Sequence, residues 1–382
     1  MPRSPGRAPA VDAIAGGIFS PLADRIREHA GPLVPLHVGD TWMEPFAGGR
    51  MEDLRVAEHP GMHRYVDTQG IPPLLDAIVG KVRARNELAC ERANVLVTGG
   101  ATGGLAAAIG ALVSPGEEVL ILSPYWPLIR GIVQSFRAIP VEVPFYDCVE
   151  SATEAVARVR ARRSPRSVAL YVSTPSNPTG RVLPADWLEA LAGLARHEDL
   201  WILSDEVYED YVYRGAHVSI GRFAPERTCT VFSFSKAYGM AGNRVGYLVA
   251  PPEAAAAARK IATHTLYHPP TAGQLAAQAA LEHGAAWVER SRLRYRQAGE
   301  AAARALGLAP PAGGTFLFLD VRPQLDARGL WGFLEDCLAD GLLLAPGPSC
   351  GQAYAGWVRL CFTAAPPDVV AQAVARLAKR VV

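Results

Sequence analysis

The sequence has no stretch that is long and apolar enough to cross a lipid bilayer, because no run of about 18 residues is free of charged side chains. The first ten residues contain arginine and proline but no apolar segment like that of a secretory signal. Basic and acidic residues nearly balance, 38 against 37, for a formal net charge of +1. This balance gives no electrostatic reason to bind nucleic acid or an anionic membrane. We expect a cytoplasmic protein with neither partner.

Cysteine is scarce and its spacing is irregular. No C-x-x-C pair and no cysteine beside a histidine cluster occurs among the six, which are Cys90, Cys148, Cys229, Cys337, Cys350 and Cys361. In a chain of 382 residues this pattern is typical of reduced, mostly buried thiols. Because the spacing of metal ligands is missing, we expect no metal site.

Short apolar runs are present, and each ends abruptly in polar or turn-forming residues. They cover residues 95–97, 119–122, 168–172, 200–203 and 231–232. Their hydrophobicity is continuous rather than alternating, which predicts strands buried on both faces, as in a parallel sheet covered by helices. Helix-like stretches lie between them, at 104–112, 151–163 and 184–196. The alternation over residues 90–250 predicts an α/β domain.

The pattern changes toward the C-terminus. A long charged helix is expected over 285–306, followed by strands at 315–321 and 357–362 and helices at 330–340 and 367–380. We therefore predict three parts, which are an N-terminal segment (1–40) that packs with the small domain, a large domain (41–285) and a small α+β domain (286–382).

Polar residues follow the predicted strands. In open parallel sheets ligands bind beyond the carboxyl ends of the strands, so we expect these residues to converge on one crevice. The turn 98–104 is rich in glycine and joins a strand to a helix, which suits a phosphate held by backbone N–H groups. It matches neither the dinucleotide-binding pattern nor the P-loop pattern. The alternative interpretation of these residues is a tight strand-to-helix turn that binds no phosphate.

An acid, a phenol and a lysine stand among these polar residues. Asp205 follows an apolar run, and a buried acid needs a cation such as a protonated pyridine, unless it caps a helix. Tyr208 could donate a hydrogen bond beside it, or be an ordinary half-buried tyrosine. Lysines usually lie in solvent, but Lys236 in a dry crevice would be a nucleophile toward aldehydes. Ser233 and Arg244 would supply a hydroxyl and a cation to a phosphate.

Three segments, residues 173–180, 204–208 and 233–246, resemble the hallmark segments of the class I/II aminotransferases and occur in the same order along the chain; these proteins are fold type I pyridoxal-phosphate enzymes. The resemblance extends from about residue 36 to the C-terminus. It implies a large, mainly parallel-sheet domain covered by helices and a smaller α+β domain. It also implies the cofactor pyridoxal 5'-phosphate and the transfer of an amino group between an L-amino acid and a 2-oxo acid, in amino acid metabolism and biosynthesis.

The resemblance assigns roles around the cofactor ring. Lys236 would hold the cofactor as a Schiff base and later carry a proton. Asp205 would pair with the pyridinium nitrogen. Tyr208 and Asn177 would hydrogen-bond the phenolic oxygen of the ring, and Trp126 would stack on the ring.

The phosphate, in the same resemblance, is held by the start of a helix and by two polar side chains. The residues implied are Gly100, Ala101, Thr102, Ser233 and Arg244.

The resemblance is less complete for the residues that would bind the substrate. Arg359 matches an arginine that binds the substrate α-carboxylate, with Asn177 and the backbone of Gly39 beside it. The alternative for Arg359 is an ordinary arginine at the protein surface. Tyr65 matches a tyrosine that reaches the phosphate of the neighbouring subunit, which implies a homodimer with shared active sites. Trp42 is either a wall of the substrate pocket or packed core.

Other functions remain open beside the leading one. The same scaffold supports β- or γ-elimination, replacement and amino-acid cyclisation, because the cofactor stabilises the same carbanion in each. A non-catalytic pyridoxal-phosphate-binding regulator and a nucleotide-binding α/β protein are further alternatives. No second arginine can be assigned to a side-chain carboxylate, which weakens strict aspartate or glutamate specificity. The sequence names neither donor nor acceptor.

Overall fold

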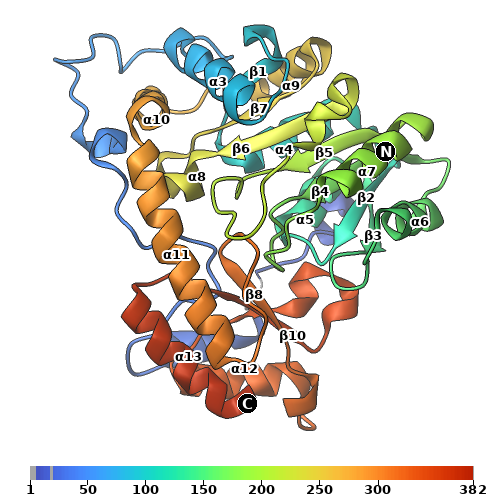
Figure 1. The fold of residues 1–382 in the computed structure, drawn as a ribbon, viewed down its shortest axis with the longest axis vertical. Helices are drawn as coiled ribbons and strands as arrows, with labels where there is room; N and C mark the ends of the chain where they lie inside the picture. The colour runs from blue at the N-terminus through green and yellow to red at the C-terminus, as the bar shows by residue number, and fades with distance from the viewer. Residues whose placement is uncertain (1–5, 18–19, 382) are drawn as a thin grey trace.

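A seven-stranded sheet forms the centre of the structure, a computed structural model that describes residues 6–17 and 20–381 (Figure 1). The strand order is β1-β7-β6-β5-β4-β2-β3. The bounds are β1 (Val95–Thr98), β2 (Glu118–Ser123), β3 (Ile139–Pro144), β4 (Ser167–Ser173), β5 (Trp201–Asp205), β6 (Thr228–Ser233) and β7 (Gly246–Val249). Strands β2 to β6 pair in parallel, whereas β7 is antiparallel to both of its neighbours. The predicted mainly parallel sheet is confirmed.

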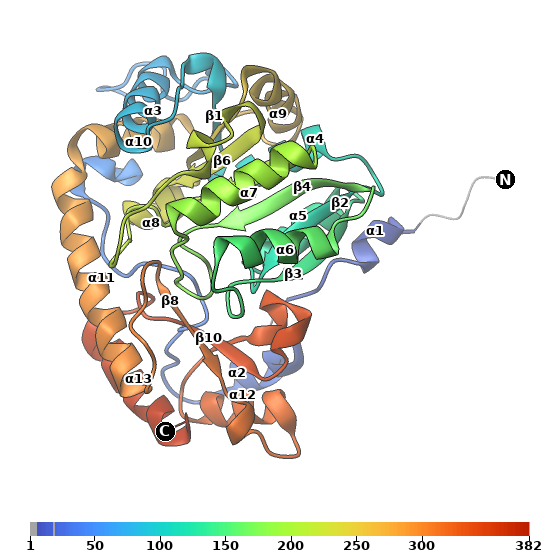
Figure 2. The same cartoon turned by 45° about the vertical axis from the view of Figure 1, so that its right-hand side comes forward.

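Helices cover both faces of this sheet (Figure 2). Apolar residues of α4, α5 and α9 form one core cluster with the strands, and residues of α6 and α7 form another on the opposite face. The helices are α1 (Pro9–Asp12), α2 (Ala23–Glu28), α3 (Pro72–Arg85), α4 (Gly100–Leu112), α5 (Leu128–Ser135), α6 (Ala152–Arg162), α7 (Ala185–His197), α8 (Phe234–Ala237), α9 (Pro252–Thr265), α10 (Thr271–His283), α11 (Ala285–Ala305), α12 (Gly329–Ala339) and α13 (Pro367–Val381).

The continuous apolar runs follow from this layering. Leu120 and Ile121 are consecutive in β2, point to opposite faces, and are both fully buried in different clusters. A strand covered on both faces must be apolar at every position, not at every second one.

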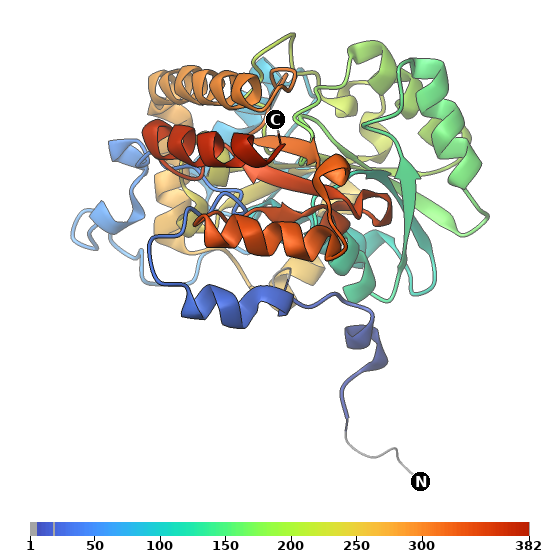
Figure 3. The same ribbon diagram turned by 90° about the horizontal axis from the view of Figure 1, so that it is seen from below.

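A second, three-stranded antiparallel sheet lies below the first (Figure 3). Its order is β8-β10-β9, with β8 (Phe316–Asp320), β9 (Ala345–Pro346) and β10 (Trp357–Cys361). Helices α12 and α13 contribute to its core, and α11 runs from the large sheet's helices down to α13. These elements confirm the expected α+β arrangement.

The N-terminal segment contacts this smaller sheet. The backbone N–H of Val34 donates to the carbonyl of Gly341, and the N–H of Cys361 donates to the carbonyl of Leu36. An ion pair of 2.8 Å joins Arg25 of α2 to Glu335 of α12.

Some elements differ from the prediction. Strand β3 was not expected, because its sequence contains two prolines and a glutamate, as suits an edge strand with exposed positions. Helix α3, which is not predicted from the sequence, begins with Pro72 and Pro73, residues that suit a first helical turn. Helix α4 begins at Gly100 rather than at 104, so the glycine-rich turn is part of its first turn.

Within the described residues, no helix is long and apolar enough to span a membrane. In the same part of the chain, no group of three or more histidine, cysteine or acidic side chains is placed to hold a metal ion.

Candidate active site

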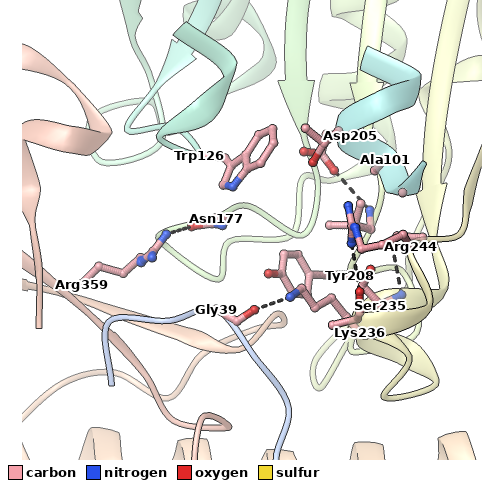
Figure 4. A pocket seen from close by; sticks show the side chains of 15 residues that line it. Gly39, Ala101, Trp126, Asn177, Asp205, Tyr208, Ser235, Lys236, Arg244 and Arg359 are labelled. Atoms are coloured by element: carbon pink, nitrogen blue, oxygen red, sulfur yellow. Dashed lines mark hydrogen bonds between the residues drawn. The ribbon is translucent and has the colours of Figure 1, made fainter. Parts of the chain in front are cut away.

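One cavity collects most of the predicted site residues at the carboxyl ends of the parallel strands (Figure 4). Asp205 ends β5 and Ser233 ends β6, while Trp126 and Asn177 follow β2 and β4. Parallel strands end at the same edge of the sheet, so residues far apart in sequence meet there. The lining residues are Gly39, Gly100, Ala101, Thr102, Trp126, Asn177, Asp205, Val207, Tyr208, Ser233, Ser235, Lys236, Ala241, Arg244 and Arg359.

Lys236 lies in the short helix α8, directly after β6. Its Nζ donates a hydrogen bond to the carbonyl oxygen of Gly39. Burial lowers the pKa of the Lys236 ammonium, against the opposing effect of Asp40. A lowered pKa increases the fraction of neutral amine, the form that attacks an aldehyde.

Asp205 is a buried acid, with 5% of its surface exposed. The hydroxyl of Tyr171 donates to Oδ2 over 2.7 Å, and the backbone N–H of Val207 donates to Oδ1 over 3.3 Å. Burial raises the pKa of Asp205 to about 6. No cationic side chain of the described residues forms an ion pair with it, so its charge lacks a counter-ion on the protein side.

The start of α4 and Arg244 line the cavity on the same side as Asp205 (Figure 4). The guanidinium of Arg244 donates to the carbonyls of Gly99 and Ala241, over 3.2 and 3.0 Å. Gly100 has a φ of +72°, and a Cβ there would lie 2.8 Å from the Arg244 side chain, so glycine is required. A helix N-terminus beside a guanidinium is suited to an anion such as a phosphate.

Arg359 of β10 approaches the cavity from the small sheet, across from Lys236 and Arg244 (Figure 4). It is buried, its Nη1 donates to Oδ1 of Asn177 over 2.9 Å, and its Nη2 donates to the carbonyl of His37 over 2.8 Å. Its Nε has no hydrogen-bond partner in the described part of the chain, and no carboxylate there pairs with it. Burial and the Arg359 charge lower the pKa of His37 to about 4.

Aromatic side chains complete the walls. Trp126 lines the cavity on the side of the large sheet, near Asp205 (Figure 4). Tyr208 is buried, and its ring meets that of Phe316 edge-on at 5.8 Å. Gly39 allows a close approach, since a Cβ there would lie 2.8 Å from the Phe316 ring.

Two predicted residues lie elsewhere in the described subunit. Trp42 is at a second cavity, between α11 and α13, and its backbone N–H donates to the carbonyl of Thr363. It does not line the cavity of Lys236. Tyr65 is 85% exposed and lies against Tyr267 and His268, with ring centroids 5.0 and 6.0 Å away.

The sequence prediction omitted several residues that line or support the cavity. Ser235 was discernible, since it lies between Ser233 and Lys236. Val207 and Ala241 carry no distinctive chemistry. Tyr171, the donor to Asp205, lies inside an apolar run and has the pattern of a core residue.

Known proteins resemble most of the chain. A family model described as "Aminotransferase class I and II" matches residues 36–377. The aspartate/prephenate aminotransferase of Thermus thermophilus is 36% identical over 321 residues, 81% of this chain and 82% of that protein. The arginine–pyruvate transaminase of Pseudomonas aeruginosa is 34% identical, covering 78% of each. Among solved structures, the aspartate aminotransferase of Thermus thermophilus with maleate has a TM-score of 0.89 at 32% identity, covering 98% of this chain and 100% of that one.

The fold, together with these relatives, defines the protein as a pyridoxal-phosphate-dependent enzyme of fold type I. The chain belongs to the aminotransferase class I and II family. It is an enzyme that transfers amino groups, and the leading prediction from the sequence is confirmed.

Proposed function

We propose that Lys236 binds the aldehyde of pyridoxal 5'-phosphate as a Schiff base and that the cavity transfers an amino group between an L-amino acid and a 2-oxo acid. One observation carries this proposal. A half-buried lysine with a lowered pKa shares a cavity with a buried acid that lacks a cation and a buried guanidinium that lacks a carboxylate. Each of these groups is costly to bury without its counterpart.

The side chains and backbone groups that line the cavity fit the ring and the phosphate of the cofactor. Asp205 would pair with the protonated pyridine nitrogen, and Tyr208 and Asn177 would hydrogen-bond the phenolic oxygen. Trp126 would stack on the ring. The phosphate is held by the start of α4 and two side chains, which together are Gly100, Ala101, Thr102, Ser233 and Arg244. When bound, the cofactor supplies an electron sink for the carbanion that forms at the substrate α-carbon.

The residues of the chain then have distinct tasks. The guanidinium of Arg359, oriented by Asn177 and the His37 carbonyl, binds the substrate α-carboxylate with two parallel hydrogen bonds. The Lys236 amine would carry the proton of the reaction, taking it at Nζ from the substrate α-carbon. Gly39, whose carbonyl accepts from Nζ, keeps this amine near the substrate position.

The assembly is proposed to be a homodimer. Tyr65 is a large aromatic residue at the surface, and it packs with the exposed Tyr267 rather than with the core. A second copy that covers this surface would bring Tyr65 to the phosphate of the neighbouring site. Two active sites are then completed by shared residues.

The cell compartment is proposed to be the cytoplasm, and the pathway an amino-acid biosynthesis. The six cysteines are all free thiols, which suits a reducing environment. The relatives named above act on aspartate and prephenate or on arginine and pyruvate, so the donor requires a direct test.

A half-reaction screen tests the proposal. Protein loaded with pyridoxal phosphate is mixed with single amino acids, without any 2-oxo acid, and its visible spectrum is followed. Conversion of the bound cofactor to the pyridoxamine form, with one equivalent of 2-oxo acid, is expected for the true donor. Release of ammonia with an unchanged cofactor would contradict transfer and indicate elimination instead.

A further inference from the structure

The contact behind Asp205 is made by Tyr171, a tyrosine that does not line the cavity itself. Tyr171 lies in β4, whose Ser173 is in register with Asp205 of β5, so its ring reaches diagonally across to the carboxylate. Its hydroxyl donates to Oδ2 over 2.7 Å. Oδ1 receives one longer contact, 3.3 Å from the N–H of Val207.

The surroundings indicate that the hydroxyl has a purpose beyond packing. The Tyr171 ring is fully buried in the apolar cluster between the sheet and helices α4, α5 and α9. A phenylalanine would fill almost the same space without burying an oxygen, which is costly unless it is hydrogen-bonded. Asp205 is the partner that offsets this cost.

The direction of the hydrogen bond is fixed. Burial, and then the charge of Asp205, raise the pKa of Tyr171 well above its ordinary value, so the phenol stays protonated and donates. The carboxylate must accept, and a donated hydrogen bond favours its ionised form. Among the described residues, Glu206, Tyr208 and Tyr146 also interact electrostatically with Asp205, and Lys236 and Arg244, which line the same cavity, form no ion pair with it.

We propose that Tyr171 is a positioning residue for the reaction, whose hydroxyl holds Asp205 ionised and turned toward the pyridine nitrogen of the cofactor. The inference rests on the proposed pairing of Asp205 with that nitrogen. Tyr171 fixes one carboxylate oxygen from behind, and the other remains available to the cavity. The acid therefore keeps the ring protonated without a protein cation beside it.

The test is a pH titration of the pyridine nitrogen, followed by ¹⁵N NMR with ¹⁵N-labelled pyridoxal phosphate and no amino acid present. Loss of a hydrogen bond to a charged group in Tyr171→Phe is expected to weaken cofactor binding roughly tenfold and to lower the pH at which the nitrogen loses its proton by about one unit. Tyr146→Phe is the matched control. It removes a buried hydroxyl whose hydrogen bonds are made with the backbone of Ser173 and not with the Asp205 carboxylate, and it should titrate like the wild type.

A double variant separates this role from a structural one. In an Asp205→Asn background, the further change Tyr171→Phe should leave the ¹⁵N titration unchanged, because the charge that Tyr171 stabilises is gone. A wild-type titration in Tyr171→Phe, or an equal shift in the Asp205→Asn background, would overturn the inference. If the wild-type protein bound no pyridoxal phosphate, the proposed function would fall, and this inference with it.

Discussion

The Nη1 atom of Arg359 donates a 2.9 Å hydrogen bond to Oδ1 of Asn177, and this bond joins the small sheet to the segment after β4 of the large sheet. Both residues line the same cavity. The guanidinium is therefore oriented before any substrate enters, and its remaining donors face a site where a carboxylate would fit.

Replacement of Arg359 by lysine should raise KM for the amino donor roughly ten- to a hundredfold, since an ammonium cannot make two parallel hydrogen bonds to a carboxylate. Steady-state kinetics with the donor found in the screen measure this effect. Arg322→Lys changes an exposed arginine next to the same sheet and should leave KM unaltered. An unchanged KM in Arg359→Lys would show that the α-carboxylate binds elsewhere.

Lys236→Ala should reduce turnover by at least about a hundredfold, because the variant loses both the covalent attachment point and the group that carries the proton. The characteristic visible absorbance of the bound cofactor should also be lost. Lys260→Ala, which alters an exposed lysine of α9, serves as the control. Near-normal turnover in Lys236→Ala is incompatible with the proposed mechanism.

Tyr65 allows a test of site sharing between subunits. Lys236→Ala and Tyr65→Ala proteins are each expected to have low activity. A hybrid dimer of the two would contain one site with an intact lysine and an intact tyrosine, and should recover about half of the wild-type turnover. No recovery in the hybrid would mean that Tyr65 acts within its own subunit or not at all.

The buried pair of Glu206 and His217 should make stability depend on pH. The two side chains are 2.9 Å apart, and Ser204 and Ser219 also donate to the carboxylate. Burial lowers the pKa of His217, but the charge of Glu206 and its hydrogen bond outweigh burial, so the net shift is upward; Glu209 raises it further and Lys81 opposes.

A raised folded-state pKa stabilises the protein fully below the unfolded value of about 6.5, and this contribution is lost as the pH rises through the folded value. The difference in Tm between wild type and His217→Gln should therefore be largest in mild acid and should shrink above neutrality. A difference that grows with pH would contradict the assigned charge state.

The sequence predicts the large sheet well because its central strands are covered on both faces. Residues 119–122 and 168–172 are apolar throughout, and such short, unbroken runs between turn residues are typical of buried parallel strands. The edge strand β3 could not be found in the same way, since proline and glutamate occupy its half-buried positions and interrupt the apolar run. Register and crossovers depend on long-range packing that no local pattern contains.

For the site, the local sequence pattern located residues at or shortly after the ends of strands, such as Asp205 and Lys236, and the resemblance to a family supplied their expected roles. The local sequence pattern could not identify Tyr171 as a site residue, because a tyrosine inside an apolar strand does not reveal that its hydroxyl contacts Asp205 on the neighbouring strand. It left Trp42 undecided between pocket and core, and the structure places this side chain at the cavity between α11 and α13. The roles of the individual residues remain predictions until the variants are measured.

The central claim, that Lys236 is the residue that binds the cofactor, is tested most directly by chemical trapping. Protein loaded with pyridoxal phosphate is reduced with borohydride, digested, and analysed by mass spectrometry. The proposed mechanism predicts a phosphopyridoxyl group on the peptide that contains Lys236 and on no other. The label on Lys81, Lys260 or Lys379, the remaining lysines of the chain, or no label at all, would contradict it.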